Sequence, residues 1–65
     1  MFEPNYDRSK LINVQHIRLL RIEPPRFEQK KWTVVADLTY GTEIMLAAET
    51  EDDCRYYMQY FYKSH

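Results

Sequence analysis

Apolar residues recur at every second position from Trp32 to Leu38, within residues 31–39. Side chains two residues apart lie on the same face of an extended chain. The pattern therefore predicts a strand over residues 31–39 with one buried face. Trp32 begins that face, which assigns the only tryptophan of the chain to the core.

The single glycine, Gly41, separates this strand from a second apolar stretch over residues 42–47. A three-residue hairpin loop requires a left-handed backbone at its last position, which glycine adopts at low cost. A loop of residues 39–41 gives both strands one shared apolar face, whereas a two-residue loop ending at Gly41 splits the apolar set. We therefore predict the three-residue loop. The resulting pairs are Leu38 with Thr42, Ala36 with Ile44, and Val34 with Leu46.

A helical period replaces this alternation near the C-terminus. Thr50 is a favourable N-cap residue, and three carboxylates follow it in the first turn, where they meet the positive end of the helix dipole. We predict a helix over residues 50–63. Its apolar stripe follows the spacing i, i+3, i+4 and i+7 and consists of Cys54, Tyr57, Met58 and Phe61.

Residues 11–23 fit two patterns. As a strand, the segment changes phase between Leu19 and Leu20, which indicates a β-bulge or a strand buried on both faces. As a helix capped by Ser9, it leaves several apolar residues outside one stripe. The β-branched residues and the terminating Pro24-Pro25 favour the strand.

These elements define a single α+β domain over residues 11–65. We expect a small antiparallel three-stranded β-meander with the C-terminal amphipathic helix packed on one face, in the order β-β-β-α. The helical interpretation of the first element gives α-β-β-α instead. Residues 1–10 are predicted to be a flexible N-terminal lead-in. Residues 24–30 are predicted to form a connecting loop, with Phe27 as a candidate side chain to anchor the loop itself.

Composition narrows the class of protein. The 65 residues include 45% apolar and 29% charged residues, which indicates a globular chain. A chain this short buries only about 60% of the surface that its unfolded form exposes, so a partner is a plausible source of additional stability. There is one cysteine, no apolar run of membrane-spanning length and no secretory pattern after Met1. We therefore expect a cytoplasmic protein without a membrane association.

No constellation of residues indicates catalysis. Cys54 falls on the buried stripe of the predicted helix, and His16 and His65 have no metal-ligand spacing. The acidic residues around the helix start are explained by the helix dipole, and the calcium-loop pattern is missing. We expect no enzyme activity, no metal and no cofactor.

The tyrosines are the most suggestive candidates for a binding role. Aromatic residues make up 15% of the chain, with six tyrosines. Tyr56 and Tyr60 lie beside the apolar stripe of the predicted helix, and Tyr62 points to another side. A helix that packs only on a small sheet does not require these residues. We therefore expect a protein-protein interaction module, a regulator, adaptor or inhibitor, that binds another protein or a second copy of itself.

A basic segment over residues 18–31 supports an alternative function. Basic side chains interleaved with aromatics can hold single-stranded nucleic acid through phosphate contacts and stacking. Two glutamates dilute this charge, and the net charge of the chain is −1, so the nucleic-acid alternative ranks below the protein-binding hypothesis. The basic residues are Arg18, Arg21, Arg26, Lys30 and Lys31.

Overall fold

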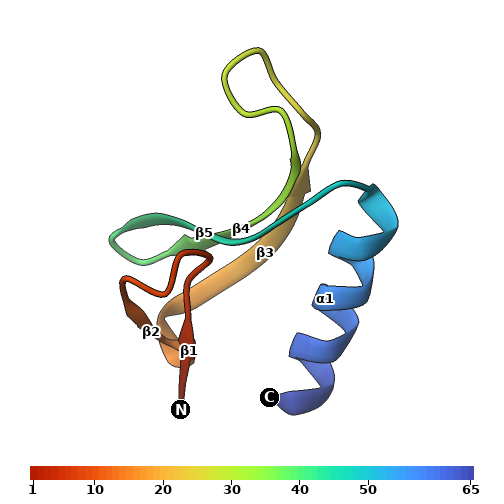
Figure 1. Ribbon diagram of the computed structural model, residues 1–65. Coiled ribbons are helices and arrows are strands. Elements are labelled where there is room, and N and C mark those ends of the chain that lie inside the picture. The colour runs from red at the N-terminus through yellow and green to blue at the C-terminus, as the bar shows by residue number, and fades with distance from the viewer.

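The computed structural model describes residues 1–65 and confirms the predicted α+β fold. A three-stranded antiparallel sheet in the order β3-β4-β5 is followed by one C-terminal helix, and a separate two-stranded sheet precedes them (Figure 1). The elements are β1 (Phe2–Pro4), β2 (Leu11–Asn13), a 3-10 turn (Val14–His16), β3 (Ile17–Glu23), β4 (Trp32–Leu38), β5 (Gly41–Ala48) and α1 (Glu51–Ser64).

Strand β4 is the centre of the sheet and carries the centre of the core. Val34 and Ala36 are fully buried, and the partly buried Trp32 packs against the same core, as the alternation predicts. Thr33 and Val35 on the other face are also buried, so β4 has buried residues on both faces and not on one only, as the sequence predicted. The core residues are Ile12, Leu20, Val34, Ala36, Leu38, Met45, Cys54 and Phe61.

A β-bulge at Arg18 sets the phase of β3. Ile17 lies opposite Leu38 and Leu19 lies opposite Asp37, so Arg18 is an extra residue without a partner in β4. Because of the bulge, Ile17 packs against the core on the same side as Leu20 and Ile22. In a strand with regular alternation, Ile17 would lie on the opposite face from these two residues.

The strand interpretation is thus correct for residues 17–23, although the irregularity lies between Ile17 and Leu19, not between Leu19 and Leu20. The earlier part of the predicted element is different. Residues 11–13 form β2 and residues 14–16 form the 3-10 turn, with Asn13 as its cap. A helix over residues 11–23 is therefore excluded.

The predicted three-residue hairpin loop is wrong. Leu38 lies opposite Gly41, so only residues 39 and 40 form the loop, and Ala36 faces Glu43 instead of Ile44. Gly41 follows the turn with a φ of 154°, a backbone conformation that favours glycine.

A second β-bulge, in β5, brings apolar residues of β4 and β5 onto one face, which the three-residue loop was expected to do. Between Val34 and Val35 the register shifts by one residue, and Met45 is the extra residue of β5. Beyond the shift, Val34 lies opposite Leu46, the one predicted pair that the structure retains.

Residues 1–10, predicted as a lead-in, include strand β1 and a hydrogen-bonded loop. Phe2–Pro4 pairs antiparallel with Leu11–Asn13, and the loop between them is organised by Asn5. The Asn5 side chain accepts a hydrogen bond from the Lys10 amide at 3.1 Å and donates to Ser9 Oγ and Glu43 Oε1, each at 3.2 Å. These bonds, together with one from the Tyr6 amide to the Ile44 carbonyl at 2.8 Å, attach the loop to β5.

Helix α1 matches its prediction closely. The Thr50 hydroxyl accepts a hydrogen bond from the Asp53 amide at 3.2 Å, as expected for an N-cap. Cys54 and Phe61 are buried, and Tyr57 and Met58 pack partly buried against the core. The helix therefore lies on the sheet through the stripe that the sequence indicates, and both of its flanks are left for solvent.

Candidate interaction surface

A groove lies along the flank of α1 that faces β5. It has a volume of about 430 Å³ and is open to solvent. Three tyrosines form one wall and two small or aliphatic residues of β5 form the other, with carboxylates at the end near the helix start. The α1–β5 groove is lined by Leu46, Ala48, Glu49, Asp53, Tyr56, Tyr57 and Tyr60.

Two of the candidate tyrosines belong to this groove. Tyr56 is 75% exposed and Tyr60 is 50% exposed, because each lies one position away from the buried stripe of α1. The ring of Tyr60 lies 6.2 Å from that of Tyr57, centroid to centroid. Tyr57 is in turn 6.2 Å from the buried ring of Phe61. The groove wall is therefore continuous with the core, which gives it a rigid base.

Tyr57 connects the core to the groove and keeps its proton. Burial, reinforced by the nearby Glu3 carboxylate and by Tyr60, raises the pKa of Tyr57 from 10.0 to about 12. At neutral pH the phenol is uncharged, so Tyr57 contributes no charge to the groove.

The charge of the groove is negative. Glu49 and Asp53 are its only charged lining residues. Glu49 forms an ion pair with Lys31 at 3.3 Å, and Asp53 forms none. An occupant with an apolar side chain and a cationic neighbour would match this lining in both shape and charge.

Tyr62 lies away from the other two candidates. It is 61% exposed and lines the opposite flank of α1, beside β3. That flank forms a more polar groove of about 380 Å³, in which Glu51 and Arg55 pair with each other at 2.7 Å. The structure thus brings Tyr56 and Tyr60 together and separates Tyr62 from them.

The basic residues of the nucleic-acid alternative are interrupted by carboxylates. Arg21 forms ion pairs with Asp37, at 3.0 Å, and with Glu23. Arg26 also pairs with Glu23, at 3.1 Å. Lys31 pairs with Glu49, so three of the five cations are partly neutralised and only Arg18 and Lys30 form no ion pair. These ion pairs reduce the positive charge that the segment can offer to a phosphate backbone.

Residues with the potential for covalent or metal chemistry are not assembled into a site. Cys54 is fully buried, and burial raises the pKa of its thiol, with a contribution from the Asp53 carboxylate. An uncharged, inaccessible thiol is a poor nucleophile. No group of three or more His, Cys, Asp or Glu side chains is placed to hold a metal ion.

Sequence reasoning missed part of the groove. Leu46 was treated only as a strand residue and Tyr57 only as a core residue, and Ala48 lay beyond the predicted strand of residues 42–47, yet all three line the groove. The bulge at Met45 decides which side chains of β5 face the helix, and no local pattern announces that bulge.

Comparison of the chain with protein-family models, with curated proteins and with solved structures finds no match. The structure contains no helix with the length and apolar character needed to cross a membrane. The arguments for function therefore come from the surface itself.

Proposed function

We propose that this protein is a non-enzymatic protein-interaction module that binds its partner along the α1–β5 groove. Tyr56 and Tyr60 are the principal contact residues, and Tyr62 contacts the partner only if the partner extends over the helix. The partner is another protein or a second copy of this chain. The proposal places the module in the cytoplasm, where a single buried cysteine has no disulfide to form.

The observation that carries the proposal is the exposure of Tyr56 and Tyr60 beside an apolar groove. The core is complete without them, because Cys54 and Phe61 are the fully packed residues of the helix. Tyrosine provides a large and rigid contact area at a small cost in conformational entropy, and it is enriched where proteins bind each other. An open groove lined by tyrosines therefore supports a binding role better than a structural one.

The test is a pair of matched variants. Replacing Tyr56 and Tyr60 together by Ser removes the groove wall, and replacing Tyr40 by Ser removes an equally exposed tyrosine at the distant β4–β5 turn. Both variants should unfold at the temperature of the wild type within a few degrees. We expect the first to lose self-association and affinity capture of protein partners from a native lysate, and the second to retain them.

Treatment of the lysate with nuclease distinguishes protein binding from the alternative function, nucleic-acid binding. If nuclease abolishes capture, and if Arg18→Ser with Lys30→Ser weakens it while the tyrosine variant does not, the protein binds nucleic acid through the basic segment and the proposal fails. A wild-type protein that stays monomeric and captures nothing also contradicts it.

A further inference from the structure

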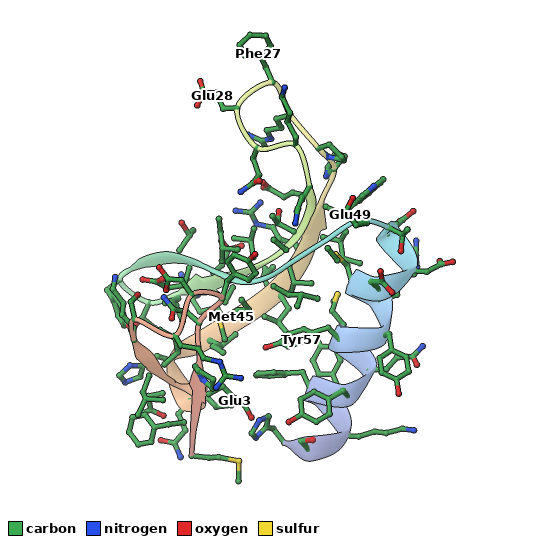
Figure 2. All side chains as sticks on the ribbon, in the orientation of Figure 1. Glu3, Phe27, Glu28, Met45, Glu49 and Tyr57 are labelled. Atoms are coloured by element: carbon green, nitrogen blue, oxygen red, sulfur yellow. The ribbon has the colours of Figure 1, made fainter.

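A second surface feature complements the groove. Phe27 is 95% exposed, more than any other large apolar residue of the chain. It lies at the tip of the loop between β3 and β4, which projects away from the sheet and the helix (Figure 2). A phenylalanine ring in this position makes no contribution to the core, so Phe27 does not anchor the loop as the sequence suggested, and its ring is available for contact.

The loop of residues 24–31 holds a defined shape. The Arg26 amide donates a hydrogen bond to the Gln29 carbonyl at 2.6 Å, which closes a tight turn around Phe27 and Glu28. Pro24 and Pro25 restrict the backbone on the approach to this turn. The turn and the two prolines restrict the backbone that carries Phe27, which limits the backbone entropy lost when the loop binds.

The loop and the groove carry opposite charges. The loop has a formal charge of +2, and the two charged residues of the α1–β5 groove are both carboxylates. Arg26 and Lys31 are paired within the chain with Glu23 and Glu49, so the unpaired opposite charges are Lys30 in the loop and Asp53 in the groove. Glu28 lies to one side of the tip, away from the ring of Phe27 (Figure 2). Lys30 forms no ion pair within the chain and is free to meet a carboxylate of the groove. The loop cations are Arg26, Lys30 and Lys31.

The loop does not occupy the groove of its own chain. The ion pair between Lys31 and Glu49, at 3.3 Å, holds the base of the loop beside the end of the groove. From this base the loop extends away from α1, and Glu49 and Phe27 are well separated in Figure 2. An apolar anchor and an apolar groove thus coexist on one molecule without contacting each other.

We propose that the α1–β5 groove of one copy binds the loop of residues 24–31 of a second copy. The ring of Phe27 inserts beside Tyr56 and Tyr60, and Lys30 approaches Asp53 of the facing chain. This inference rests on the proposed function and names the occupant of its groove as another molecule of the same protein. The groove volume of about 430 Å³ accommodates one aromatic side chain with its neighbours.

Sedimentation velocity over a range of protein concentrations tests the association. We expect the weight-average mass of the wild type to rise with concentration and to fall again at high salt, because opposite charges attract across the contact. Phe27→Ser and the double variant Tyr56→Ser/Tyr60→Ser should each raise the dissociation constant at least about tenfold, which corresponds to about 1.4 kcal/mol. Tyr40→Ser should leave it unchanged.

A mixing experiment distinguishes this contact from any other mode of association. The Phe27→Ser variant keeps an intact groove, and the double tyrosine variant keeps an intact loop. Each alone should be monomeric, whereas an equimolar mixture should form a heterodimer through one loop and one groove. A mixture that remains monomeric while the wild type associates overturns the inference.

Failure of the inference is separable from failure of the proposed function. A wild type that is monomeric at every concentration, yet captures another protein in a Tyr56- and Tyr60-dependent manner, overturns self-recognition and leaves the interaction module standing. Self-association with a dissociation constant that Phe27→Ser leaves unchanged also overturns the inference. Loss of both self-association and capture contradicts both proposals.

Discussion

The side chain of His65 lies 2.7 Å from Glu3, Nε2 to Oε2, and joins the end of α1 to strand β1. The His65 ring also packs on Phe61, with 4.6 Å between ring centroids. Both partners of the Glu3–His65 contact are largely shielded from solvent, with 18% and 8% of their side chains exposed. The two ends of the chain are thereby held together over the core, as Figure 1 also shows.

We expect this contact to stabilise the fold measurably. Glu3→Ala and His65→Ala should each lower the free energy of unfolding by about 1 kcal/mol, since each variant leaves a partly buried polar group without its partner. Urea titration of both single variants and the double variant measures the coupling, which should be about 0.5–1 kcal/mol. Strictly additive losses would show that the two side chains contribute independently.

The raised pKa of Tyr57 predicts a loss of stability in alkali. In the unfolded chain the phenol ionises at its ordinary value of 10.0, whereas in the folded chain it ionises at about 12. The folded state therefore binds more protons than the unfolded state between these values, so stability is fully present below pH 10 and falls as pH rises toward 12. Because the side chain is only partly buried, we expect a loss of about 1 kcal/mol, well below the full ~2.7 kcal/mol of such a shift.

Tyr57→Phe should remove this pH dependence. Comparison of its unfolding free energy with that of the wild type at pH 9 and pH 11.5 isolates the contribution of Tyr57 from those of other groups. Absorbance at 295 nm provides a direct check, because the variant should lack the last phenol ionisation step. An alkaline titration that Tyr57→Phe leaves unchanged would show that the raised pKa does not belong to Tyr57.

The cluster around Glu43 predicts a loss of stability in acid. The hydrogen bond from Lys10 Nζ, at 2.8 Å, and a second from the Asn5 amide lower the pKa of Glu43 below its ordinary value of 4.5. The stabilisation is therefore present above pH 4.5 and is lost as pH falls through the lowered pKa. We expect Glu43→Gln to cost about 1 kcal/mol at pH 7 and to unfold with a weaker acid dependence. Glu28→Gln, in the exposed loop, is the matched control.

Cys54 should report on opening of the core. Because its thiol is fully buried and its pKa is raised by burial, a thiol reagent should label the folded protein at least about 100-fold more slowly than the unfolded chain. Cys54→Ser places a hydroxyl without a partner in the same site and should cost about 1–3 kcal/mol. Rapid labelling of the native protein, measured by mass spectrometry, would contradict the packing of α1 on the sheet.

The parts of the fold that could be predicted are those in which apolar residues repeat at a regular spacing along the sequence. The alternation from Trp32 to Leu38 and the stripe from Cys54 to Phe61 each repeat often enough to specify an element and its buried face. The exposure of Tyr56 and Tyr60 follows from the same helical geometry, so the candidate contact residues could also be located from sequence.

The parts that escaped prediction depend on contacts between distant residues. The loop of residues 5–10 is organised by Asn5, whose partner Glu43 lies 38 positions away. The turn length after Leu38 depends on whether β5 contains an extra residue, and a bulge leaves no periodic signature. The groove combines one helix flank with one strand, so its lining is defined only when both elements are in place.

Each edge strand of the three-stranded sheet contains one residue without a pairing partner in β4, namely Arg18 in β3 and Met45 in β5. Deleting Arg18 or Met45 would leave every other pair of the sheet aligned as it is now. Removal of either residue would keep the register of the sheet, but with unequal consequences. Loss of Arg18 would straighten an exposed edge, while loss of Met45 would leave an empty space beneath the helix.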